Sequence, residues 1–133
     1  GADGNALAHK HVLVAEDNAL NAEVITAILN IHDATCEVAA NGEEAVAKFG
    51  MSAPGTFDMI FMDVQMPVMN GHDAARAIRA MDRPDAGAIP IIAMTANAFA
   101  EDERQALACG MNAHVSKPID VHTLQRVVAK LSQ

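Results

Sequence analysis

The stretch from Phe57 to Gly71, FDMIFMDVQMPVMNG, constrains the fold more than any other part of the chain. Its apolar run ends in Asp63, and a loop that contains Pro67 follows at once. A short apolar run between turn signals is typical of a strand that is buried on both faces of a sheet. Because proline cannot donate to a strand ladder, the strand must end before Pro67. We therefore expect Asp63 at the carboxyl end of a central strand, where open α/β sheets bind their ligands.

Four further apolar runs alternate with amphipathic stretches along the chain. We expect strands at residues 11–15, 36–40, 57–63, 90–95 and 114–116. Helical patterns fill the intervals, over residues 20–31, 43–49, 74–81 and 99–109, and a last one opens near Asp120. Alternation of this kind predicts a parallel sheet with right-handed crossovers. The expected fold is a doubly wound (βα)5, flavodoxin-like α/β domain, with helices on both faces of a five-stranded sheet of order 2-1-3-4-5.

Helical spacing also predicts which side of each helix faces the core. For the first helix it selects Leu20, Val24, Ala27, Ile28 and Ile31. For the third it selects Ala74, Ala75, Ile78 and Met81, with Arg76 and Arg79 facing outward. For the last it selects Val121, Leu124, Val127, Val128 and Leu131.

Composition excludes several classes of function. The 133 residues suffice for one domain with a real core, and no apolar run approaches the roughly 20 residues of a membrane span. The formal net charge of −8 and the lack of Trp and Tyr argue against nucleic-acid binding, which needs a basic face or aromatic stacking. The only cysteines, Cys36 and Cys109, lie in apolar segments, which indicates reduced core residues in a cytosolic chain.

The first ten residues carry no periodicity and lack the apolar core of a signal peptide. We interpret residues 1–10 as a linker or a remnant of cloning, and residues 11–133 as the domain.

Polar side chains follow four of the expected strands. Glu16 and Asp17 follow the first, Asp63 ends the third, Thr95 ends the fourth and Lys117 follows the fifth. In a sheet of order 2-1-3-4-5 these strand ends are neighbours, so three carboxylates would lie close together. Like charges so close stay ionised only beside a cation, and an all-oxygen site open to solvent favours Mg²⁺.

A hydroxyl and an ammonium beside such a carboxylate form a cradle for a transferring phosphoryl group. A carboxylate can itself act as the nucleophile and form an acyl phosphate, and Asp63 is centrally placed for that role. Taken singly, each residue also fits a plainer role: Asp63 and Thr95 as caps, the acids as helix-start residues and Lys117 as a solvated loop residue. Because the polar residues at four strand ends together supply carboxylates, a hydroxyl and an ammonium, we favour a phosphoryl-binding site over these separate roles.

These positions carry four motifs: VLVAEDN at 12–18, MDVQMP at 62–67, PIIAMTA at 90–96 and SKPI at 116–119. With them the chain resembles a response-regulator receiver domain over about residues 10–132. The details EDNxxN at 16–21 and QMPVM at 65–69 resemble receivers of hybrid sensor histidine kinases and phosphorelay proteins more than stand-alone transcription regulators.

The resemblance implies that Asp63 is the phosphoacceptor of a two-component system. It would take a phosphoryl group from a phosphohistidine on a histidine kinase or a histidine phosphotransfer protein. The Mg²⁺ ion would be held by Asp17 and Asp63, by the backbone carbonyl of Gln65, and by Glu16 mostly through water.

By the same resemblance, Thr95 and Lys117 would bind the phosphoryl oxygens, and the side chains of Gln65 and Asn97 would tune the lifetime of the aspartyl phosphate. The family usually carries Tyr or Phe three residues before the lysine, as a ring that swings inward once Thr95 moves. Here that position is His114, so we expect a switch that is weaker or sensitive to pH, or a solvent-facing histidine without a switching role.

Three rival functions fit less well. A phosphohydrolase with an aspartyl nucleophile, of the haloacid dehalogenase type, needs an acid two residues after the nucleophile, where this chain has Gln65. A flavin-binding flavodoxin would need a phosphate loop where Glu16 and Asp17 stand, and aromatic flanks. A degenerate receiver used only for docking is disfavoured by the complete set of Asp, Thr and Lys side chains.

We expect no enzyme activity from the isolated domain beyond its own phosphorylation and dephosphorylation. Its output would pass through partner proteins or through a longer parent, such as a hybrid histidine kinase. We expect it in the cytoplasm, without membrane contact of its own, and as a possible homodimer.

Overall fold

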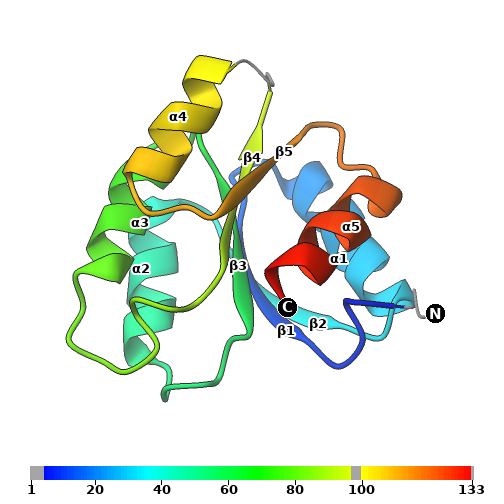
Figure 1. Ribbon diagram of the computed structural model, residues 1–133, viewed down its shortest axis with the longest axis horizontal. Helices are drawn as coiled ribbons and strands as arrows, with labels where there is room; N and C mark the ends of the chain where they lie inside the picture. Colours follow the sequence, from blue (N-terminus) through cyan, green and yellow to red (C-terminus); the bar gives the residue numbers. More distant parts are fainter. Residues whose placement is uncertain (1–4, 97–99, 133) are drawn as a thin grey trace.

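The computed structural model of the protein describes residues 5–96 and 100–132 (Figure 1). Strands and helices alternate through these residues as β1 (His11–Ala15), α1 (Ala19–Ile31), β2 (Thr35–Ala39), α2 (Gly42–Met51), β3 (Met59–Asp63), α3 (Gly71–Arg79), β4 (Ile91–Thr95), α4 (Ala100–Ala108), β5 (Ala113–Ser116) and α5 (Val121–Leu131). Neighbouring strands are parallel, and their order is β2-β1-β3-β4-β5. The predicted doubly wound α/β fold is confirmed.

Two layers of helices enclose the sheet. In Figure 1, α1 and α5 cover one face, and α2, α3 and α4 lie on the other. The central strand β3 is buried along its whole length, as predicted: Met59 and Phe61 join the apolar cluster under α1 and α5, and Ile60 and Met62 join the cluster under α2 and α3. A strand sealed on both faces is rigid, and it ends in Asp63.

The predicted inner face of α1 is wrong. Leu20, Val24 and Ile31 are 67%, 47% and 75% exposed, and the helix instead buries Ala22, Ile25 and Leu29. Because most of α1 is apolar, two stripes at helical spacing are available, and periodicity alone does not say which one meets the sheet. The stripe that was assigned to the core is an exposed apolar surface.

Arg79 is the second departure from the predicted faces. Arg76 is exposed as expected, whereas Arg79 is half-buried. Its guanidinium donates hydrogen bonds to the carbonyl oxygens of Gly110 and Ala86, both at 2.9 Å, and to Oδ1 of Asn112 at 2.8 Å. The loops before β4 and β5 cover a helix side that the pattern assigns to solvent.

The segment before β1 is packed on the domain as well. Leu7 is completely buried and belongs to the apolar cluster under α1 and α5. The lack of periodicity in this segment gave no indication of that contact. None of the helices in the described part of the chain is long and apolar enough to cross a bilayer.

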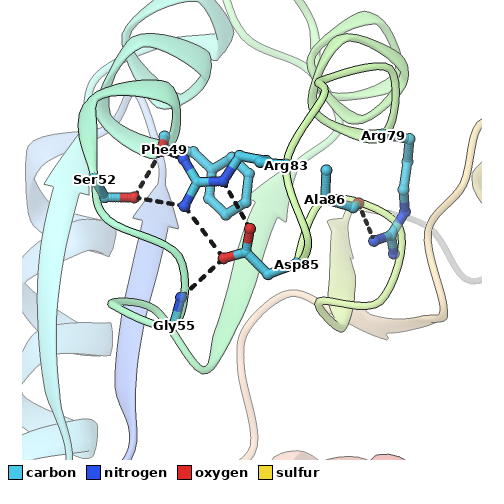
Figure 2. Close-up of polar contacts among 7 residues, drawn as sticks. All are labelled: Phe49, Ser52, Gly55, Arg79, Arg83, Asp85 and Ala86. Carbon is cyan, nitrogen blue, oxygen red and sulfur yellow. Dashed lines mark hydrogen bonds and ion pairs between the residues drawn. The ribbon is translucent and has the colours of Figure 1, made fainter.

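A second arginine, Arg83, joins α2 to two loops, the one that precedes β3 and the one that precedes β4 (Figure 2). The guanidinium of Arg83 lies 4.2 Å from the centre of the Phe49 ring and donates a 2.5 Å hydrogen bond to the Phe49 carbonyl oxygen. Its Nε lies 2.6 Å from Asp85 Oδ1, and Asp85 Oδ2 also accepts from the Gly55 backbone at 3.1 Å. The Arg83 side chain is only 10% exposed, so these contacts are largely shielded from water.

We predict that Arg83→Ala lowers the free energy of unfolding by about 2 to 3 kcal/mol. The substitution removes a cation–π contact, the ion pair with Asp85 and a hydrogen bond to the Phe49 carbonyl oxygen, all made by a largely buried side chain. Arg76→Ala is the matched control, because the Arg76–Asp73 pair is about 60% exposed and should contribute no more than about 0.5 kcal/mol. Urea unfolding of both variants measures the difference, and equal losses would contradict the prediction.

Candidate functional site

The register of the sheet brings the predicted site residues together. Asp63 ends β3 beside Met94, and Ala15 at the end of β1 pairs with Met62. Glu16 and Asp17 therefore emerge next to Asp63. On the other side Thr95 pairs with Ser116, which places Lys117 one residue further along the same edge.

A cleft of about 320 Å³ opens at this edge. All five predicted side chains line it, together with Asn18, Asn21 and Gln65. Glu16, Asp63 and Thr95 are only 2%, 4% and 5% exposed, whereas Asp17 is exposed. The cleft thus has a buried acidic floor and a rim open to solvent.

One ammonium group holds the two buried carboxylates. The Nζ atom of Lys117 lies 2.9 Å from Oε1 of Glu16 and 3.0 Å from Oδ2 of Asp63. Two carboxylates and one ammonium leave a negative charge, to which the nearby Asp17 adds another. The site is therefore built to attract a cation.

Burial in this floor raises the pKa of Asp63 from 3.8 to about 6. The hydrogen bond from Lys117 acts in the opposite direction, and the charge of Glu16 raises the value further. Burial alone would lower the pKa of Lys117, but its hydrogen bonds to Glu16 and Asp63 outweigh that effect and the pKa is raised. The lysine therefore stays charged, and a cation beside Asp63 would favour the ionised form of that carboxyl.

Backbone groups fix the orientation of both carboxylates. The amide of Asn18 donates to Oε2 of Glu16 at 3.1 Å, and the amide of Gln65 donates to Oδ1 of Asp63 at 3.2 Å. The loop after β3 then folds back tightly on the strand. The approach is so close that a Cβ atom at Gly71 would lie 2.2 Å from the carbonyl oxygen of Asp63. Only glycine fits there.

The acidic residues of the cleft fit a hard divalent cation. One carboxylate oxygen from each of Glu16, Asp17 and Asp63 can be chosen so that all three lie within 4.8 Å of one another. The donors are all oxygens, the net charge is negative and one member of the set is exposed, which suits an ion that keeps several waters.

The remaining predicted residues have different positions. Gln65 is exposed on the rim of the cleft. His114 does not line the cleft; it lines a separate hollow of about 230 Å³ between α4, β5 and α5, with Glu103 and Lys130. Asn97 lies outside the described residues.

Two polar residues that line the cleft, Asn18 and Asn21, were not predicted as part of the site. Asn18 caps α1 by accepting a hydrogen bond from the Asn21 amide at 3.0 Å, and both residues line the cleft from the first turn of that helix. Both residues belong to the EDNxxN motif at 16–21, which served in the sequence analysis only as a point of resemblance to hybrid kinase receivers.

Comparison with known proteins supports one family. The response regulator receiver domain family matches residues 12–129. The hybrid signal transduction histidine kinase I of Dictyostelium discoideum is 35% identical over 127 residues, which cover 94% of this chain. Histidine kinase 2 of Arabidopsis thaliana is 31% identical over 96% of the chain. The matches span only 7% and 12% of those relatives.

Solved structures agree with this assignment. The receiver domain of the sensor histidine kinase PA1611 from Pseudomonas aeruginosa, which has a magnesium ion coordinated in its active-site cleft, aligns with a TM-score of 0.83 and 35% identity. The alignment covers 95% of this chain and all of that one. The receiver domain of Ssk1 from Saccharomyces cerevisiae, solved with the histidine phosphotransfer protein Ypd1, aligns with a TM-score of 0.80 and 30% identity, over 93% of this chain and 89% of that one.

The fold, the acidic cleft with its shared lysine and these matches lead to one conclusion. The chain belongs to the response regulator receiver domain family of two-component signal transduction, and its relatives include the receiver domains of hybrid histidine kinases.

Proposed function

We propose that Asp63 accepts a phosphoryl group from a phosphohistidine and that this step switches the contacts of the domain with partner proteins. The observation that supports the proposal most is the floor of the cleft, where a nearly buried Asp63 carboxylate lies 3.0 Å from the Lys117 ammonium and beside two further acids. The Lys117 ammonium and a cation held by the acids would neutralise the charge of an incoming phosphoryl group and of the carboxylate that receives it.

Each residue has a distinct role in this step. An oxygen of Asp63 attacks phosphorus, the bond from phosphorus to the histidine nitrogen breaks, and that nitrogen keeps the electron pair. Lys117 and Thr95 would bind the phosphoryl oxygens as the acyl phosphate forms. Bound Mg²⁺ would neutralise charge on the carboxylates and the phosphoryl group. Its ligands would be Asp17, Asp63, the Gln65 backbone carbonyl and, through water, Glu16.

We further propose that the exposed apolar stripe of α1 receives the phosphodonor. Leu20, Val24 and Ile31 lie on the helix whose first turn lines the cleft through Asn18 and Asn21. An exposed apolar patch beside a reactive site is suited to a protein partner. No Lys or Arg occurs between Lys10 and Lys48, so a donor with apolar residues and a basic rim would complement this side of the domain.

The donor would be a histidine kinase or a histidine phosphotransfer protein, and the parent of this domain a hybrid kinase of the cytoplasm. The yeast receiver with its histidine phosphotransfer protein supports the first part, and the hybrid kinase relatives support the second. Thr95 and His114 would relay the phosphorylated state toward α4 and α5, and Gln65 and Asn97 would set its lifetime. We assign residues 11–133 to the receiver domain.

Phosphorylation of Asp63 is tested by intact mass after incubation with acetyl phosphate and Mg²⁺. We predict a single phosphoryl adduct that requires Mg²⁺ and is absent from Asp63→Asn. Thr95→Ala should slow its formation, because a donor to the phosphoryl oxygens is lost. A folded wild-type protein that binds Mg²⁺ and forms no adduct would point to a receiver used only for docking.

The docking stripe is tested by transfer from a phosphorylated histidine phosphotransfer protein. We predict that Val24→Glu slows transfer from the protein donor at least about tenfold, since it places a charge in an apolar interface. Labelling by acetyl phosphate should not change. Leu107→Glu is the control, since Leu107 is 51% exposed on α4, away from the cleft. If Val24→Glu slows both donors equally, the stripe is not a docking surface.

A further inference from the structure

Residues 5–10 lie between α1 and α5 instead of extending away from the domain. Leu7 has no exposed surface, and it belongs to the same apolar cluster as Leu29 of α1 and Leu124 and Val128 of α5. Figure 1 shows this short N-terminal segment passing close to both helices before it turns into β1. Burial of a leucine side chain at this junction stabilises the contact between the two helices.

A pair of amide side chains strengthens the contact. Gln125 of α5 accepts a hydrogen bond from the Leu7 backbone at 3.3 Å through Oε1, and its Nε2 donates to Oδ1 of Asn5 at 2.7 Å. Asn5 in turn donates from Nδ2 to the carbonyl oxygen of His32, which caps the C-terminus of α1, at 2.6 Å. The side chain of Asn5 thus links the two helices directly.

The segment is also joined to the start of β2 through the backbone. The amide of His9 donates to the carbonyl oxygen of Asp33 at 2.8 Å, and the amide of Thr35 donates to the carbonyl oxygen of Lys10 at 2.9 Å. His9 and Asp33 both adopt left-handed conformations, with φ of 65° and 63°. Few non-glycine residues adopt this conformation, and His and Asp are among those that tolerate it best, so both residues suit the turns at this junction.

This arrangement has consequences for α5. The helix begins at Val121, shortly after Lys117 of the cleft, and its residues Val127, Lys130 and Leu131 line the hollow that contains His114. Asn5, the first described residue, lies at the junction of α1 and α5. The contacts of residues 5–10 lie before the stretch that the receiver family matches, which begins at residue 12.

We propose that residues 5–10 form a clasp that locks α5 onto α1 and couples the positions of the two helices. Displacement of Asn5 and Leu7 would release the side chain of Gln125 and loosen the packing of α5. Coupling of this kind is reciprocal: a change in α5 also loosens the clasp. The proposal depends on packing and hydrogen bonds and does not require that Asp63 is phosphorylated.

The test is hydrogen exchange followed by mass spectrometry on Leu7→Ala, Asn5→Ala and Gln125→Ala. We expect Asn5→Ala and Leu7→Ala to speed amide exchange in α5 and in the last turn of α1 by about tenfold, with little change in α2 and α3 on the other face. Gln125→Ala should speed exchange of the Leu7 and His9 amides, as reciprocity requires. Gln105→Ala is the control, because Gln105 is exposed on α4 and does not line the hollow that α4 shares with α5.

Two results would overturn the proposal. One is exchange in α5 that does not differ between the clasp variants and the α4 control. The other is exchange that rises equally on both faces of the sheet, which would mean that the segment only adds to global stability. Should Leu7→Ala prove too unstable to purify, Asn5→Ala and Gln125→Ala decide the question, because both remove hydrogen bonds and leave the apolar cluster intact.

Discussion

One ammonium group shared by two buried carboxylates is the interaction on which the site depends. Glu16 and Asp63 are almost inaccessible to water, and each lies within about 3 Å of Lys117 Nζ. A buried charge without a partner is costly, so neither acid could occupy this floor in ionised form without the lysine. The pKa of Asp63 is raised mainly by its burial, and the charge of Glu16 adds to the effect, whereas Lys117 acts in the opposite direction. The negative charge of this floor suits it to bind a divalent cation.

The sheet topology makes this arrangement possible. Parallel strands deliver their carboxyl ends to one edge, and the order β2-β1-β3-β4-β5 places the ends of β1 and β4 on either side of β3. The strand that carries Asp63 is sealed by apolar clusters on both faces, which keeps the carboxylate from moving away from Lys117. Gly71 lets the next loop return close to the strand, so the cleft stays open above the acid.

The sequence predicted the parts of the protein that follow from strand chemistry. The apolar run before Asp63 and the polar residues after the other strands were sufficient to place Glu16, Asp17, Thr95 and Lys117 at one cleft, because parallel strands share an edge. The same reasoning failed for α1, where the apolar periodicity fits two different stripes of the helix. Most of α1 is apolar, so its periodicity fitted either stripe, and the exposed stripe was assigned to the core.

Contacts between residues that are distant in sequence could also not be predicted from local sequence patterns. Arg79 was predicted to face solvent because the carbonyl groups that it binds lie in loops distant in sequence. Leu7 lies in a segment without periodicity, and its partner Gln125 lies near the other end of the chain. The pattern of apolar and polar residues within a short stretch of sequence carries no information about contacts between distant stretches. Asn97 lies outside the described residues. The switching role of His114 stays a proposal, because the hollow that this residue lines is separate from the cleft.

The charge balance of the cleft leads to a definite expectation for pH. Because the pKa of Asp63 is raised to about 6 in the folded domain and is near 3.8 when the carboxyl is unperturbed, the folded state binds more protons between about pH 4 and pH 6. The stability of the metal-free domain should therefore fall as pH rises through that window. The loss is on the order of 2 to 3 kcal/mol, complete by neutral pH and absent from Asp63→Asn.

The most direct measurement is an NMR titration of the Asp63 side-chain carboxyl carbon, with and without Mg²⁺. The charge balance described above predicts a pKa of about 6 without metal, and a lower pKa at saturating Mg²⁺, because the cation favours the ionised form. An ordinary value near 3.8 in the metal-free protein would contradict it. Asp63 would then be ionised without help, and the cleft would not depend on a second cation.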